Sequence, residues 1–247
     1  MKISLLAAAL ALAVPATFAH GPAQHEGGIA SKPAPTVRTD FDIVHAKISV
    51  KDHVATFHMA VSGHAGSSHP AATGKLAGSR VFSYVWPLSL DPHAVGFEHD
   101  AGTLALAVTS HPDFDDTPLF DENGDGRRDN DGDLWHSHWV VLEPTPECGD
   151  GALGVVDIPP GTMPRLPKTW PGLPLLIDSP GWDPTLAGDT VEVHVPFDAG
   201  IPLDGMHYDG VTAGLRVNAS VHAPLLCVTD VFKVASGDLS LPGRIGP

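Results

Sequence analysis

Two histidines separated by one residue, His136 and His138, stand in an apolar, strand-like segment that covers residues 134–142. Side chains alternate along a strand, so both imidazoles project from one face, about 7 Å apart. That face also carries Val140 and Leu142, which predicts that the pair points to the interior. Buried imidazoles need a hydrogen bond or a metal ion, and two on a rigid face suit zinc, copper, iron or nickel. The segment therefore predicts a transition-metal site, with hydrogen-bonded core histidines as the alternative.

The remaining ligands of such a site must come from other parts of the chain, and strand alternation does not choose among them. Candidates in predicted strands are His58, His194 and His222, and candidates in predicted loops are His99 and His111, the latter beside Asp113. We carry His58 and His111 forward as predicted metal ligands beside the pair.

The segment directly before the histidine pair is strongly acidic. Nine acidic residues and two arginines fall between Asp113 and Asp133, in a chain whose formal net charge is −15. Such a cluster repels itself and needs a counter-ion unless it stays solvated. From Asp121, acceptor oxygens recur at every second position, and Gly126 permits the sharp turn that brings them together. Calcium binds six to eight oxygens, so residues 121–133 predict a calcium loop, with a solvated acidic turn as the alternative.

This loop resembles the calcium loops of EF-hands, dockerins and thrombospondin type 3 repeats. Gly132 stands where an EF-hand has its bidentate glutamate, so a neighbouring aspartate would have to substitute. No flanking helices are predicted, which favours a structural calcium loop inserted in a β protein. The resemblance implies as ligands Asp121, Asn123, Asp125, the carbonyl oxygen of Arg127, Asp129, and Asp131 or Asp133.

The string from His136 through His138 to Glu143 is similar to the first metal motif of cupins. That resemblance implies Glu143 as a third ligand and His207 as a fourth, with an oxygenase or isomerase activity. The glycine expected before the first histidine is replaced by Asn130, and the match covers only a small part of the chain.

Residues 1–19 have the pattern of a secretory signal peptide, with an apolar run and small residues at Thr17 and Ala19. The run is too short to cross a bilayer, and no later segment is long and apolar enough. Cleavage would make His20 the first residue, which resembles the copper-binding start of copper-carrying periplasmic proteins and lytic polysaccharide monooxygenases. With His25, it forms a candidate N-terminal metal site, and the export signal predicts a secreted, periplasmic protein.

The rest of the chain predicts an all-β fold, namely an antiparallel β-sandwich or jelly-roll-like domain with long Pro/Gly-rich loops. Its 24 prolines and 26 glycines disfavour helices. We expect a mobile arm over residues 20–36 and a single β domain over 37–247, with a long loop at 159–184. Strands are predicted at 55–61, 81–86, 103–109, 134–142, 190–196, 211–221 and 226–234.

The two cysteines, Cys148 and Cys227, are predicted to form a disulfide, because an isolated pair in an oxidising compartment usually does so. Closing a loop of about 80 residues stabilises the fold by roughly 4 kcal/mol. The alternative, that both cysteines bind metal, lacks the usual close spacing of cysteine ligands.

The composition also excludes several classes of function. The net negative charge argues against nucleic acids and anionic membranes as partners. The chain has no nucleophile signature, phosphate loop or dinucleotide fingerprint, which favours a binding protein over an enzyme. The sequence therefore predicts a periplasmic metal-binding protein with Ca²⁺ and with copper or zinc, and it names no protein partner. A cupin-like or histidine-brace metalloenzyme and a calcium-stabilised extracellular binding module remain as alternatives.

Overall fold

The computed structural model describes residues 27–245, which fold almost entirely into antiparallel β-sheets. The predicted all-β fold is therefore confirmed. Two short 3₁₀ helices, η2 (Pro92–Val95) and η3 (Pro146–Cys148), interrupt the strands. No helix within the described range is long and apolar enough to span a bilayer. The predicted signal peptide, His20 and His25 lie outside the described residues.

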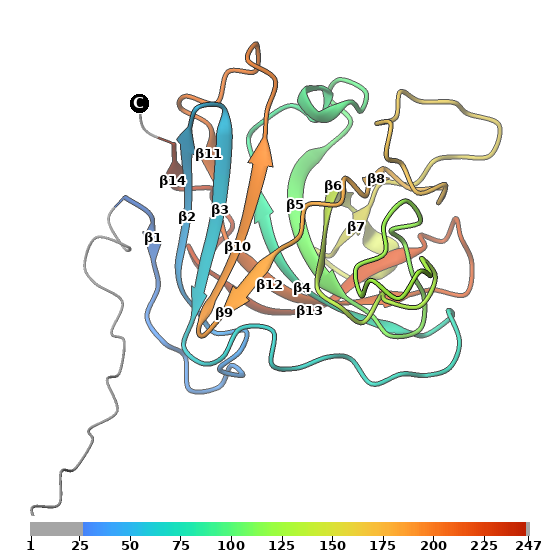
Figure 1. Ribbon diagram of the computed structural model, residues 1–247, viewed down its shortest axis with the longest axis horizontal. Helices are drawn as coiled ribbons and strands as arrows, with labels where there is room; N and C mark the ends of the chain where they lie inside the picture. Colours follow the sequence, from blue (N-terminus) through green and yellow to red (C-terminus); the bar gives the residue numbers. More distant parts are fainter. Residues whose placement is uncertain (1–26, 246–247) are drawn as a thin grey trace, which may run out of the picture.

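One sheet has five strands in the order β1-β2-β3-β10-β9 (Figure 1). Its strands are β1 (Ile29–Ala30), β2 (Ile43–Lys51), β3 (Val54–Val61), β10 (Thr190–Pro196) and β9 (Thr185–Ala187). A tight turn joins β2 to β3, and both of its central residues have positive φ, 50° at Asp52 and 63° at His53. Residues 29–30, which the sequence analysis placed in a mobile arm, instead pair with β2.

A second sheet has the order β5-β4-β12-β13-β7-β6-β8, and an additional pairing of β5 with β6 closes six of its strands into a barrel. Its strands are β4 (Arg80–Pro87), β5 (Thr103–Ser110), β6 (His136–Pro144), β7 (Leu153–Val155), β8 (Ile177–Asp178), β12 (Val211–Val217) and β13 (Leu226–Val234). A third, small sheet pairs β11 (His207–Tyr208) with β14 (Gly243–Arg244).

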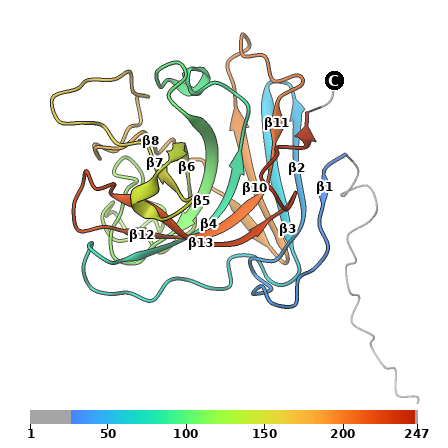
Figure 2. The same cartoon turned by 180° about the vertical axis from the view of Figure 1, so that it is seen from behind.

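The five-stranded sheet lies beside the barrel, as both views show (Figures 1 and 2). Strand alternation gives each barrel strand an outer and an inner face. The outer face packs against the five-stranded sheet, where Phe57 makes edge-to-face contacts with Trp86 and Trp139, at 5.9 Å between ring centroids in both cases. The inner face lines the barrel with small and branched residues, among them Val81, Val85, Ala105, Ala107, Val140, Leu142, Val211 and Ala213.

Each predicted strand overlaps an observed one, although β6 starts at His136 and β12 ends at Val217. The predicted disulfide is confirmed, and it joins Cys148 at the end of η3 to Cys227 in β13. The sequence did not reveal the closure of the second sheet, because that closure depends on pairings between strands that are distant in the chain.

Candidate metal site

Four buried side chains meet at one end of the barrel, namely His111, Asp116, His136 and His138. Their exposed fractions are 1%, 5%, 3% and 1%, respectively. The Nε2 atom of each histidine lies 3.2 Å from the same atom, Oδ1 of Asp116. This group has the composition and the spacing to hold a metal ion.

The barrel strands place the histidines. His136 and His138 lie on the inner face of β6, opposite Thr109 and Ala107 of β5. His111 directly follows the end of β5, and its ring stacks on Phe114 at 3.9 Å between centroids. The predicted inward orientation of the β6 pair is therefore observed, since both side chains are buried.

The far ring nitrogen of each histidine is held by a fixed partner. Nδ1 of His111 lies 2.9 Å from the carbonyl oxygen of Phe114, and Nδ1 of His136 lies 2.8 Å from that of Leu134. A carbonyl oxygen only accepts, so both Nδ1 atoms carry the proton and donate it. In a neutral ring, Nε2 then presents a lone pair to the cluster.

A hydroxyl group fixes His138 in the same tautomer, with the proton on Nδ1. Its Nδ1 lies 3.1 Å from Oγ of Ser179, and that hydroxyl donates its own proton to the carbonyl oxygen of Asp116 at 2.7 Å. Ser179 Oγ can therefore only accept from His138. All three Nε2 atoms are thus oriented as acceptors toward one carboxylate oxygen, which is the arrangement that outer-shell partners impose on metal-binding histidines.

Without a cation this arrangement leaves polar atoms poorly satisfied. Asp116 Oδ1 and His138 Nε2 are buried and have no hydrogen-bond partner in the described part of the chain. Nε2 of His111 and Nε2 of His136 are 3.0 Å apart, and a hydrogen bond between them would require one ring to be a buried imidazolium. Oγ1 of Thr109 is 3.1 Å from Nε2 of His136 and can donate a hydrogen bond to it. A bound cation would satisfy Asp116 Oδ1 and the three Nε2 atoms at once.

The carboxylate is charged at neutral pH. Burial raises the pKa of Asp116, but positive charge on His138 and His111 and hydrogen bonds from His111 and His136 outweigh it and hold this pKa well below its usual range. With the rings neutral, as their Nδ1 partners arrange them, a bound cation would supply that positive charge instead. The site therefore offers three imidazole nitrogens and one anionic oxygen, a donor set that suits zinc, copper and other transition metals rather than calcium.

A second group of acidic side chains lies next to the first and consists of Asp115, Glu122 and Asp131. Asp131 is 1% exposed, and its Oδ2 accepts hydrogen bonds from the backbone N–H groups of Glu122, at 2.6 Å, and Asn123, at 3.2 Å. Asp131 Oδ1 and Glu122 Oε2 are buried without a hydrogen-bond partner among the described residues. Burial raises the pKa of Asp115 and of Glu122, and Asp131 adds to both effects. Three crowded carboxylates, two of them with buried and unpartnered oxygens, form a candidate site for a hard cation.

Of the predicted calcium ligands, only Asp131 belongs to this group. Asp121 accepts hydrogen bonds from the N–H groups of Asp125 and Gly126, and Asp125 accepts one from the N–H of Arg127. These side chains therefore stabilise the turns of their own loop. Asn123 bonds the N–H of Asp125 in the same way, at 2.8 Å. The predicted convergence of the whole 121–133 set is therefore not observed.

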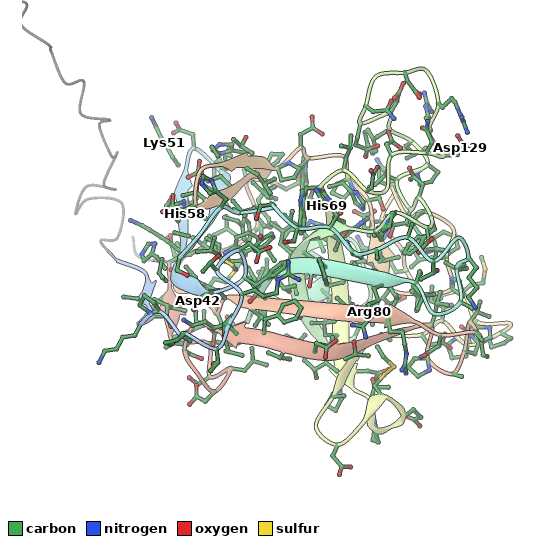
Figure 3. The ribbon with its side chains drawn as sticks, turned by 90° about the horizontal axis from the view of Figure 1, so that it is seen from below. Asp42, Lys51, His58, His69, Arg80 and Asp129 are labelled. Carbon is green, nitrogen blue, oxygen red and sulfur yellow. A yellow bond between two sulfur atoms is a disulfide. The ribbon has the colours of Figure 1, made fainter. Side chains whose placement is uncertain are left out.

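The outer part of that loop is exposed to solvent. Asp129 forms an ion pair with Arg127, and Figure 3 shows it at the outer end of the loop. Asp133 is also exposed, and its carbonyl oxygen, rather than its carboxylate, accepts a hydrogen bond from Ser110.

The structure brings one predicted extra histidine, His111, to the β6 pair and leaves the others elsewhere. His58 lies on β3 of the five-stranded sheet, where its Nδ1 is 3.0 Å from Glu192 (Figure 3). Glu143 is exposed near the far end of β6, and His207 lies on β11, so the ligand set of the cupin-like pattern is not assembled. Three further candidates have other neighbours: His99 lies near Asp91, His194 near Thr56 and His222 near Asp157.

Sequence reasoning missed Asp116. It stands five residues after His111 in the chain, so the two make a local pair that could have been read as ligands. The surrounding aspartates led instead to its assignment to a general acidic cluster.

The loop between β5 and β6 packs tightly against the candidate metal site. The N–H of His111 donates to the carbonyl oxygen of Gly132 at 2.7 Å. A Cβ atom at Gly132 would lie 2.0 Å from the carbonyl oxygen of Phe114, so only glycine fits there. Gly132 therefore serves close packing between the acidic loop and the histidine site.

Comparison of the chain with protein-family models, with curated proteins and with solved structures gives no match. The fold and the site alone define the class: an antiparallel β-barrel protein with a buried His/Asp group that could hold a metal ion.

Proposed function

We propose that this chain is an exported metal-binding protein that holds a transition-metal ion, copper or zinc, between His111, Asp116, His136 and His138. The observation that carries the proposal is the convergence of three Nε2 atoms on one buried carboxylate oxygen, each at 3.2 Å. The bonds at all three Nδ1 atoms support it, because they turn the lone pairs inward.

Two features support export. Residues 1–19 have the pattern of a signal peptide, and the Cys148–Cys227 disulfide is compatible with an oxidising compartment such as the periplasm.

A second, structural cation is proposed at Asp115, Glu122 and Asp131, with calcium as the ion that suits oxygen donors. The buried, unpartnered oxygens of Asp131 and Glu122 support it. This site replaces the longer ligand set expected from the loop motif. Because the N–H of Leu134 bonds the carbonyl of Asp131, and the carbonyl of Leu134 bonds His136, an ion here would also stiffen the start of β6.

Metal analysis of the purified protein tests the proposal. The protein is stripped with a chelator, reloaded separately with copper and with zinc, desalted and assayed by elemental analysis. We expect one transition-metal ion per chain in the native protein and none in the His136→Ala/His138→Ala variant. The control is His194→Ala/His207→Ala, which also removes two histidines but leaves both candidate cation sites unchanged. Equal loading of all three proteins, or no loading of the native one, would refute the transition-metal site.

A further inference from the structure

The interior of the barrel contains a cavity of about 390 Å³ that reaches the candidate metal site. His111, Asp116 and His138 form part of its wall. This volume falls within the range of roughly 300–1,000 Å³ that is typical of small-molecule sites. The cavity is therefore large enough for a ligand that contacts a bound metal ion.

The cavity is polar at one end and apolar along its length. On β6, His138 lies at the metal-site end, and Val140 and Leu142 continue the wall away from it. Leu142 is four residues from His138, which is roughly 13 Å along a strand. The only carboxylates in the wall are Asp116 at the site and Asp150, which is exposed in the loop that follows β6 and η3.

The other wall residues are mainly aliphatic. Most come from β4, β5, β7, β8, β12 and β13, and they include Val85, Ala107, Ala213, Leu226 and Val234. Apart from the histidines, Phe114 is the one aromatic residue in the wall, and it is stacked on His111. A flexible hydrocarbon chain fits such a wall better than a planar ring that needs aromatic partners.

The charge at the polar end favours an anion. Three neutral imidazoles, one carboxylate and a divalent ion sum to a single positive charge. Metals that take five or six ligands would keep open positions after binding the four protein side chains. Three of these four side chains line the cavity, so open positions would face its interior.

We propose that the barrel binds an aliphatic monocarboxylate of medium chain length, with its hydrocarbon chain along the barrel wall and its carboxylate on the metal ion. This inference rests on the proposed metal site. It assigns to the barrel a ligand-binding role in addition to holding the ion.

Calorimetric titration with octanoate, decanoate and decanol tests the ligand class on copper-loaded, zinc-loaded and metal-free protein. Burial of each added methylene should tighten binding by about fourfold until the cavity is filled. Decanoate should bind at least tenfold more tightly to one metal-loaded form than to the metal-free protein, and decanol should not show this difference. Equal binding of decanoate and decanol, or no dependence on chain length, would overturn the inference.

Ala213→Leu tests the location. Ala213 lies in the cavity wall on β12 and is not one of the candidate ligands, so the larger side chain should reduce the space without removing the ion. We expect full metal loading and at least tenfold weaker decanoate binding. Unchanged decanoate binding in this loaded variant would place the ligand elsewhere.

The two proposals fail differently. Native protein that loads a transition metal but binds no decanoate in any form would reject the ligand and leave the metal site intact. Native protein that loads no transition metal would reject both. The chain-length series needs only the native protein, so the test stands even if Ala213→Leu does not fold.

Discussion

Asp115 and Asp116 are consecutive in the chain, yet their carboxylates belong to different groups. Asp116 lies among the three histidines, whereas Asp115 lies with Glu122 and Asp131. The two candidate cation sites are thus joined by a single peptide bond, and the backbone N–H of Asp131 lies 3.4 Å from Asp115 Oδ2. This arrangement makes the two sites separable by substitution of adjacent residues.

The first prediction uses this pair. Asp116→Asn should weaken transition-metal binding by more than about 100-fold, because it removes the anionic donor and not only an outer-shell contact. Asp115→Asn should weaken calcium binding and leave the transition metal bound within about tenfold. Titrations of each variant with each ion measure both effects. Loss of both ions in both variants would mean that the sites are not separate.

The second prediction concerns Ser179, whose hydroxyl group links His138 Nδ1 to the carbonyl of Asp116. Ser179→Ala removes the partner that orients His138, so transition-metal affinity should fall by about 10- to 100-fold. Ser137→Ala is the matched control, because this buried hydroxyl donates to the carbonyl of Trp182 rather than to the cluster. A competition assay with a chromogenic chelator compares them, and equal affinities would remove the positioning role of Ser179.

The third prediction concerns a buried ion pair outside the site. Asp42 accepts hydrogen bonds from Lys233, Ser62 and the N–H of Ala34. Burial raises the pKa of Asp42, but these partners prevail and hold it below its ordinary value. A lowered folded-state pKa stabilises the protein above the unfolded pKa of about 3.9, and that contribution is lost as the pH falls through the folded value.

Asp42→Asn should therefore reduce the free energy of unfolding by about 3 kcal/mol at neutral pH, because Lys233 loses its buried partner. The difference from the native protein should shrink as the pH falls below about 4. Urea unfolding at several pH values measures it. Asp198→Asn, an exposed acid, should show almost no effect at any pH. A destabilisation by Asp42→Asn that stayed constant with pH would contradict the role of its charge.

The fourth prediction concerns the disulfide, which joins residues separated by 79 positions. Cys148→Ala/Cys227→Ala should lower the free energy of unfolding by about 4 kcal/mol, because the unfolded chain regains the freedom of a long loop. Denaturant unfolding of the native and variant proteins, each with and without a reductant, measures this. Reductant should destabilise only the native protein, and an equal response of both would argue against the pairing.

Much of this structure follows from local patterns in the sequence. Alternation along β6 is sufficient to place His136 and His138 on one face and to predict that they are buried, because neighbouring apolar residues share that face. The strand positions and the cysteine pair were predictable for the same reason, since propensity, alternation and redox chemistry act over short stretches or on few residues.

The completed site was not predictable in this way. Asp116 joins the histidines because β5 pairs with β6 and the loop between them folds back against Gly132. Likewise, acidic composition indicated a cation, but backbone hydrogen bonds to Asp131, rather than the spacing of the aspartates, select which carboxylates meet. Barrel closure and loop packing depend on contacts between distant residues, whose energies no short stretch of sequence contains.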